Sequence, residues 1–283
     1  MGVINSLLER QDAIFQDRLN HASLLDGGLL SSAKFKRYRH NDVFDLQKQL
    51  ENTHARRRLV ATDAVFSMDG DSAELKHLSQ VCDEQNAWLM VDDAHGFGVL
   101  GPNGAGSAIA QGLTIKECPI YMATLGKALG SYGAFVAGSD TLIESLIQFS
   151  RNYIYTTAIP PSIAAASLAA VQLLTEEMWR QQHLNHLINI FKARSKELGL
   201  PLMSSDTAIQ PIMIGSSNGA LKASSALKEM GLLVTAIRPP TVPKNTARLR
   251  ITLSAAHTES HLHKLLEALA GLQKQGLLPS VEK

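Results

Sequence analysis

A lysine between two glycines is the residue of this sequence best suited to covalent chemistry. Lys127 lies in the segment TLGKALG (124–130), directly after a short apolar run. A lysine amine inside a cleft can form a Schiff base with a carbonyl compound, and glycines let the backbone approach a ligand closely. Thr124 could donate its hydroxyl to a phosphate group. Taken alone, the segment is also consistent with a lysine on the protein surface.

Two more polar segments follow apolar runs. Asp92, Asp93 and His95 come after the run 88–91, where carboxylates are costly unless they are paired or functional. They are consistent with a turn, with a divalent metal site, or with a carboxylate that holds a cationic ring nitrogen. Ser67 comes after the run 58–66, and its Asp- and Gly-rich surroundings alone favour an ordinary turn.

The order of these segments is more specific than any one of them. Serine, then Asp-x-x-His, then Thr-x-x-Lys follow successive predicted strands, and open α/β sheets bind ligands at the carboxyl ends of their strands. Pyridoxal 5′-phosphate (PLP) needs a lysine for its aldehyde, an acid for its pyridine nitrogen, and donors for its phenolate oxygen and phosphate. The pattern therefore predicts a PLP site.

The elements that would position these residues alternate between strands and helices. Apolar runs predict strands at 58–66, 88–92, 121–124 and 134–137. A helix is expected over 71–86, with Asp71 and Glu74 as its capping pair. Such alternation predicts an α/β three-layer sandwich with a mostly parallel sheet.

After Pro160 and Pro161 the pattern changes to that of a smaller α+β domain. We expect a large domain over 1–168 and a small domain over 169–283. In this second part, helices are predicted over 162–178, 181–198, 219–230 and 258–272. Strands are predicted over 209–214, 232–237 and 248–253.

Composition excludes several classes of protein. The chain has 283 residues, enough for about two domains, and a net charge of +1, so no basic excess suggests nucleic acid. Cys82 and Cys118 match no metal or disulfide spacing. The sequence shows neither a transmembrane run nor a signal peptide at its first residues. We therefore expect a cytoplasmic protein that binds neither membrane nor nucleic acid.

With these residues in view, the sequence resembles the α-oxoamine synthases, a family of fold-type I PLP enzymes. The resemblance covers nearly the whole chain from Asp17 onward. The matching stretches are DRLNHASLLDGG (17–28), FSMDGD (66–71), LMVDDAHGFGVLG (89–101), TLGKALG (124–130), YTTAIPPS (155–162) and TAIRPPTVPKNTARLRITLSAAHT (235–258).

The resemblance implies a reaction. Members of the family condense an amino acid with an acyl thioester and release carbon dioxide. The stretch 235–258 most resembles the biotin-pathway member, which joins L-alanine to a pimeloyl group carried by coenzyme A or by a carrier protein. Another member of the family, such as glycine C-acetyltransferase, is the alternative.

The resemblance also implies roles for individual residues. Lys127 would hold the cofactor aldehyde and move protons, Asp92 would hold the pyridine nitrogen, and Asp93 would be structural. His21 would stack on the ring, although its position also suits the start of a helix. The remaining implied contacts are His95 and Ser67 to the phenolate oxygen, Thr124 to the phosphate, Thr157 to the phosphate of a partner subunit, and Arg250 to the substrate carboxylate, with Arg248 as its rival.

The sequence departs from the family at its start. Relatives carry an N-terminal segment with a Gly-rich turn that cups the phosphate, whereas this chain opens at MGVINSLLERQD. We therefore expect a PLP-binding domain that is incomplete at its N-terminus, in a homodimer with shared active sites. Two alternatives are a non-catalytic remnant of the fold and a metal-dependent hydrolase built on Asp92, Asp93 and His95. The hydrolase would leave Lys127 and Arg250 unexplained.

Overall fold

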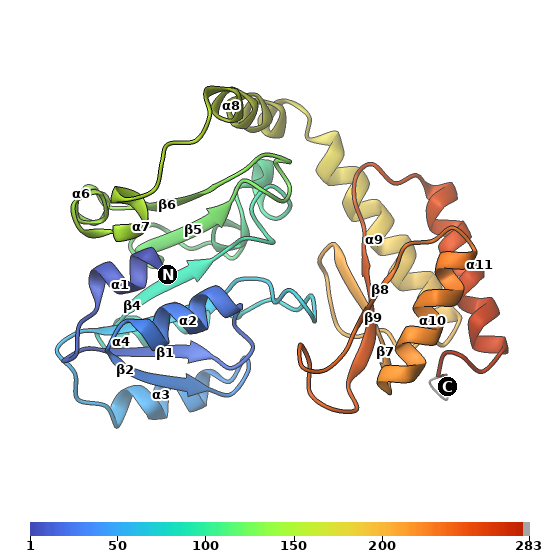
Figure 1. Ribbon diagram of the computed structural model, residues 1–283, viewed down its shortest axis with the longest axis horizontal. Helices are drawn as coiled ribbons and strands as arrows, with labels where there is room; N and C mark the ends of the chain where they lie inside the picture. Colours follow the sequence, from blue (N-terminus) through green and yellow to red (C-terminus); the bar gives the residue numbers. More distant parts are fainter. Residues whose placement is uncertain (280–283) are drawn as a thin grey trace. The chain divides into compact units, whose positions relative to one another are not determined.

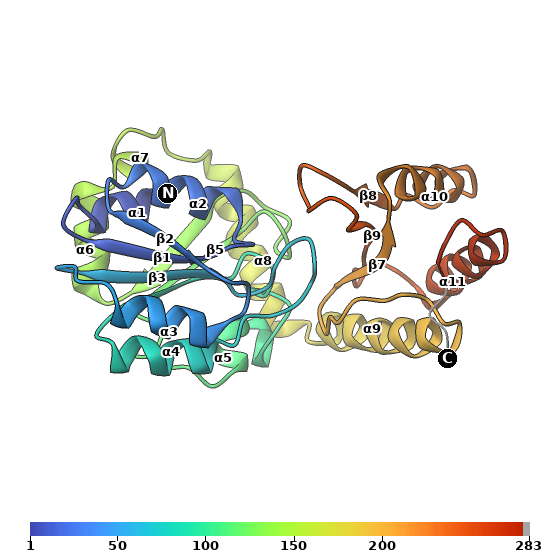
Figure 2. The same ribbon diagram turned by 90° about the horizontal axis from the view of Figure 1, so that it is seen from below.

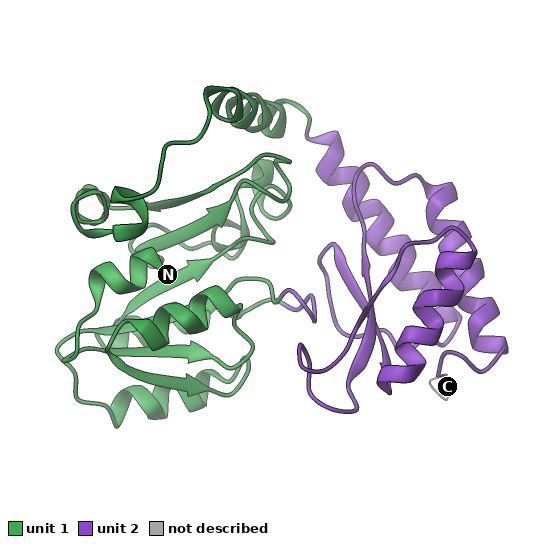
Figure 3. Cartoon of the chain, in the orientation of Figure 1, with its two compact units in different colours: residues 1–66, 72–177 green, residues 67–71, 178–283 purple. Residues whose placement is uncertain are grey.

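The computed structural model describes residues 1–279, which form two compact units (Figure 3). The large unit comprises residues 1–66 and 72–177, and the small unit comprises residues 67–71 and, within the described range, 178–279. The boundary expected between residues 168 and 169 falls inside helix α8 (Pro161–Glu176). This helix stays with the large unit, where the Ser167 hydroxyl lies 2.6 Å from that of Ser131.

A six-stranded sheet forms the middle of the large unit (Figure 1). Five strands are parallel, and only the edge strand β6 runs antiparallel to its neighbour β5. The predicted α/β class with a mostly parallel sheet is therefore confirmed. In sheet order the strands are β2 (Lys34–Tyr38), β1 (Ala13–Asp17), β3 (Arg58–Asp63), β4 (Trp88–Asp92), β5 (Ile120–Thr124) and β6 (Ala134–Gly138).

Helices cover both faces of this sheet (Figure 2). Buried side chains of α1 (Gly2–Leu7), α2 (Ala22–Leu30) and α6 (Asp140–Phe149) share one apolar cluster with alternate residues of the strands. Those of α3 (Val43–Glu51), α4 (Leu75–Glu84) and α5 (Ser107–Ala110) share the other. Strands that are buried on both faces are apolar throughout, and these apolar runs are the signal that predicted β3 and β4. The short elements η1 (Pro102–Gly104) and α7 (Arg151–Ile154) complete the unit.

The predicted start of helix α4 is wrong. The helix begins at Leu75, and its N-cap residue Glu74 makes no side-chain capping hydrogen bond. Residues 67–71 instead form a loop that packs with the small unit. The proposed capping pair fails because Asp71 lies outside the helix.

The small unit contains an antiparallel sheet of three strands in the order β7-β9-β8. Helix α10 packs on this sheet, and α11 contacts both α10 and α9. Over residues 1–279, no helix is long and apolar enough to cross a membrane. The elements of the unit are α9 (Trp179–Glu197), β7 (Ile209–Gly215), α10 (Ser217–Glu229), β8 (Thr235–Ile237), β9 (Ala247–Thr252) and α11 (Glu259–Lys274).

Candidate active site

Strands β4 and β5 carry most of the predicted site residues of the large unit at their carboxyl ends. Asp92 is the last residue of β4 and Thr124 is the last residue of β5. His95 and Lys127 each follow three residues later, in the turns after these strands. Because β4 and β5 are parallel neighbours, both turns lie at the same edge of the sheet.

Asp92 is a buried acid within electrostatic range of Lys127, His21 and the N-terminal amine of Met1. Its Oδ1 accepts a hydrogen bond of 3.1 Å from the backbone N–H of Ala94. Burial raises the pKa of the Asp92 carboxyl, while that hydrogen bond and the charges of Lys127 and His21 act in the opposite direction. The fold thus brings Lys127 and His21 within electrostatic range of Asp92, although these two residues are more than a hundred positions apart in the chain.

Asp93 is used differently from Asp92. It accepts hydrogen bonds from the backbone N–H of Ser107 and the Ser107 hydroxyl, both at 2.6 Å, and from the Tyr121 hydroxyl at 2.8 Å. These bonds oppose the effect of burial, which raises the pKa of Asp93. Both oxygens of Asp93 therefore accept hydrogen bonds inside the fold, whereas the bond described for Asp92 comes from the backbone N–H of Ala94.

We expect Asp93→Ala to destabilise the chain without removing the side chains of the site. The substitution leaves buried donors on Ser107 and Tyr121 unsatisfied, which costs about 3 kcal/mol. Urea unfolding monitored by circular dichroism measures the loss. A matched control is Asp26→Ala on the exposed face of α2, and equal unfolding free energies for the two variants would contradict the structural role of Asp93.

His21 lies at the start of helix α2, as one interpretation of the sequence expected. It is the N-cap residue, and its Nδ1 accepts a hydrogen bond of 3.3 Å from the backbone N–H of Ser23. The Ser23 hydroxyl lies 2.9 Å from the same nitrogen. These contacts orient the exposed imidazole ring through its Nδ1 atom. The ring lies within electrostatic range of Asp92.

Asp63 is a further candidate site residue, which is not among the residues predicted from the sequence. It ends strand β3 and pairs in register with Asp92 on β4. Its Oδ2 accepts a hydrogen bond of 2.5 Å from the backbone N–H of His21, and its own N–H donates to Asn20 Oδ1 at 3.0 Å. Burial and the neighbouring Asp92 raise the pKa of Asp63 well above its usual range. The sequence does contain a signal for Asp63, because it is an acid at the end of an apolar strand, as Asp92 is at the end of β4.

Thr124 fixes the turn that carries Lys127. Its hydroxyl donates to the carbonyl oxygen of Gly133 at 3.0 Å and accepts from the N–H of Gly126 at 3.1 Å. Thr157 lies apart from these residues in sequence, in the exposed segment between α7 and α8.

The remaining predicted site residues, Ser67 and Arg250, lie in the small unit and are hydrogen bonded to each other. Arg250 on β9 donates from Nε to the carbonyl oxygen of Ser67 at 2.6 Å. Its rival Arg248 is nearly buried and forms an ion pair with Asp69. Arg248 is thus already matched by a carboxylate, whereas the bonds described for Arg250 go to uncharged oxygens of Ser67 and Thr252. Arg250 is the better candidate for a substrate carboxylate.

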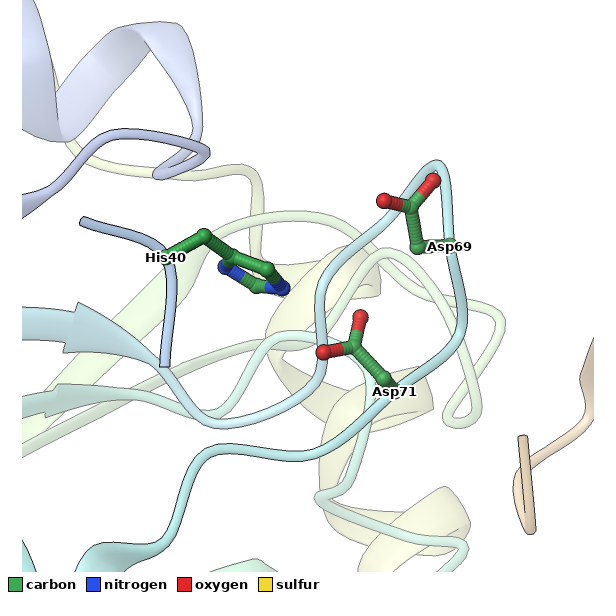
Figure 4. Close-up of side chains that lie close together, drawn as sticks. All are labelled: His40, Asp69 and Asp71. Atoms are coloured by element: carbon green, nitrogen blue, oxygen red, sulfur yellow. The ribbon is translucent and has the colours of Figure 1, made fainter. Parts of the chain in front are cut away.

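The metal-dependent alternative is not supported by the donor geometry. Among residues 1–279, Asp92, Asp93 and His95 do not form a group with converging ligand atoms. Figure 4 shows the one histidine and aspartate group that does converge in this range, His40, Asp69 and Asp71. His40 belongs to the large unit and the two aspartates to the loop 67–71 of the small unit, so we assign no site to them.

Solved structures place this architecture among the fold-type I PLP-dependent enzymes. Serine palmitoyltransferase from S. paucimobilis, solved with a PLP–myriocin aldimine, matches with a TM-score of 0.93 and 30% identity, over 98% of this chain and 70% of that one. The 8-amino-7-oxononanoate synthase of Francisella tularensis matches with a TM-score of 0.86 and 33% identity, over 98% of this chain and 80% of that one.

Sequence comparison gives the narrower assignment. The family model of aminotransferase class I and II matches residues 2–269. The 8-amino-7-oxononanoate synthase of Saccharophagus degradans is 58% identical over 275 residues, 97% of this chain and 69% of the relative. That of Cellvibrio japonicus is 57% identical over 269 residues, 95% of this chain and 68% of the relative. The chain belongs to the 8-amino-7-oxononanoate synthase family, which confirms the resemblance predicted from its motifs.

Proposed function

We propose that the chain catalyses the PLP-dependent condensation of L-alanine with a pimeloyl thioester, with loss of carbon dioxide, to form 8-amino-7-oxononanoate for biotin synthesis. The observation that carries this proposal is the grouping of Asp92, Lys127 and His21 at the carboxyl edge of a sheet. The 58% identity to a named synthase supports the same reaction. The acyl carrier is coenzyme A or a carrier protein, and the proposed compartment is the cytoplasm.

The donor set of the large unit fits PLP. An amine on a turn, a buried carboxylate and an imidazole within electrostatic range of that carboxylate match the aldehyde, the ring nitrogen and the ring face of this cofactor. When bound, PLP supplies an electron sink for a carbanion formed at the α-carbon of an amino acid. The loop 67–71 adds Ser67, and the turn after β4 adds His95, as donors to the phenolate oxygen.

Each residue then has a task in this proposal. Lys127 holds the cofactor aldehyde and carries the α-proton of alanine away and back at its Nζ. Asp92 keeps a proton on the ring nitrogen, and His21 covers the ring. Thr124 binds the phosphate, which requires its hydroxyl to exchange the hydrogen bond that it now donates to Gly133. Thr157 reaches the phosphate held by a second copy of the chain.

The surface of the large unit supports a homodimer. Helix α8 is rich in Ala and Leu, yet none of its residues is buried. Several large apolar side chains near it in sequence are also exposed, which is unusual for a surface that stays in water. These exposed side chains are Phe149, Tyr153 and Tyr155, together with Leu168 of α8 itself. Sedimentation of the purified chain tests for the dimer.

Turnover assays test the proposed reaction directly. The purified chain, loaded with PLP, is incubated with L-alanine and either pimeloyl-coenzyme A or the pimeloyl carrier protein, and the product is measured by mass spectrometry. A parallel reaction with glycine and acetyl-coenzyme A tests the alternative family member. If the folded chain forms 8-amino-7-oxononanoate from neither pimeloyl donor, the proposal is wrong.

Arg250→Lys should weaken the binding of alanine. Lysine keeps the positive charge but loses the planar pair of donors that a carboxylate accepts, so we expect the KM for L-alanine to rise about tenfold. The KM for the pimeloyl thioester should stay unchanged. Steady-state kinetics measure both values, and Arg194→Lys on the exposed face of α9 is the control. An unchanged KM for alanine would argue against this role.

A further inference from the structure

The loop Ser67–Asp71 lies between two elements of the large unit in the chain but packs in the small unit (Figure 3). The carbonyl oxygen of Gly70 accepts a hydrogen bond of 3.0 Å from the Thr207 hydroxyl, and the Ser205 hydroxyl lies 2.8 Å from the same oxygen. Gly70 has a φ of +72°, and a Cβ at this position would collide with the carbonyl oxygen of Ile209. The loop is therefore fitted closely to the chain before and within β7.

An ion pair fastens the same loop to strand β9. The side chain of Arg248 is only 4% exposed and pairs with Asp69. Its Nε also donates to the carbonyl oxygen of Thr246 at 3.0 Å. A charge this deeply buried needs a partner, so Arg248 and Asp69 hold each other in place.

Arg250 follows Arg248 by two residues and therefore lies on the same face of β9. Its Nε donates to the carbonyl oxygen of Ser67, at the other end of the loop. A guanidinium has five N–H donors in one plane. With Nε bound to Ser67 and Nη1 donating to the Thr252 hydroxyl at 3.3 Å, the plane is oriented, and the other N–H groups of the two terminal nitrogens can pair with a carboxylate.

We propose that the Asp69–Arg248 ion pair positions Arg250 for the carboxylate of the amino-acid substrate, by fixing the loop whose Ser67 carbonyl orients the Arg250 guanidinium. The proposal rests on the function proposed above. Asp69 and Arg248 are positioning residues, because they act through Ser67 and Arg250. The same loop carries the Ser67 hydroxyl, so the substrate contact and one cofactor contact share a single support.

The test is Asp69→Asn in the full chain, which removes the charge and keeps the size of the side chain. We expect the KM for L-alanine to rise about tenfold, while the KM for the pimeloyl thioester and kcat change less than about twofold. Titration of the PLP-loaded variant with L-alanine, followed by its visible absorbance, should show the same weakening of binding. In the chain without PLP, hydrogen exchange of the amides of residues 67–71 should become faster.

Two further variants make the result specific. Asp69→Glu keeps the charge and should recover part of the alanine affinity. Glu197→Gln makes the same acid-to-amide change in the exposed pair with Arg194 and should change nothing. If Asp69→Asn does not fold, Asp69→Leu combined with Arg248→Met removes both buried charges and should still weaken alanine binding.

The possible failures can be told apart. A parent chain without turnover overturns the proposed function. An active parent whose Asp69→Asn variant keeps its alanine KM, its alanine affinity and its hydrogen exchange overturns the positioning role. Equal losses toward alanine and toward the thioester would also overturn it, because they would show a general structural defect.

Discussion

Replacing Lys127 with alanine should remove the visible absorbance that the parent chain develops with PLP and lower turnover at least about a thousandfold. Lys127 supplies the amine that holds the cofactor aldehyde and the base that takes the α-proton, so one substitution removes both. It lies three residues after β5, close enough to Asp92 to affect its pKa. Absorbance titration with PLP measures the first effect, and the assay with L-alanine and pimeloyl thioester measures the second.

The control for Lys127 is another lysine of the large unit. Lys116 is exposed and precedes β5 rather than following it, so Lys116→Ala should titrate with PLP like the parent. If Lys127→Ala developed the same absorbance as the parent, a different amine would hold the cofactor, and the assignment of the site would be wrong.

Replacing Asp92 with asparagine should have the second-largest effect on activity. It should lower turnover but raise the stability of the chain without cofactor. An amide cannot balance the charge of a protonated ring nitrogen, so we expect turnover to fall at least about a hundredfold. The chain without cofactor should nevertheless be more stable at pH 7 than its parent, because asparagine carries no charge to desolvate. Turnover assays and urea unfolding at pH 7 measure the two effects.

The direction of the stability effect follows from the pKa of Asp92. Burial raises it in the folded chain, while the unfolded value is about 3.9. The folded state then binds the proton more tightly, so the favourable contribution is complete below pH 4 and is lost as the pH rises through the folded pKa. The stability gain of Asp92→Asn should therefore be present at pH 7 and absent near pH 3. The exposed Asp26→Asn is the control, and a gain that does not change with pH would contradict the explanation.

Sequence patterns predicted the central strands well. Strand β4 has its predicted bounds, Trp88–Asp92, because a strand buried on both faces is apolar throughout. The order of polar segments along the chain also predicted that the turns carrying Asp92 and Lys127 would follow neighbouring parallel strands, which end at the same edge of a sheet.

The first fifty residues were not assigned to elements because their local signals are weak. Strand β2, at the sheet edge, has three charged residues among its five, and α2 contains the adjacent glycines Gly27 and Gly28. Gly28 is required by packing, since a Cβ there would lie 2.7 Å from ring atoms of Phe35. Helix propensity cannot anticipate a contact of this kind.

Two errors at strand β3 have one physical origin. The predicted strand ran to Phe66, which hid Asp63 inside it, and the predicted helix began at Asp71. The chain instead leaves the sheet at Asp63 and gives residues 67–71 to the small unit. Partners such as Arg248, far away in the sequence, decide this path, and no local pattern contains them.

Because the loop 67–71 packs in the small unit, a single cut of the chain cannot separate the two units. A chain begun at Met178 would contain every helix and strand of the small unit, yet it would lack Asp69. Arg248 would then keep its place on β9 without the carboxylate that balances it. Any recombination of this small unit with a different large unit must therefore transplant two stretches of sequence, and the shorter one has only five residues.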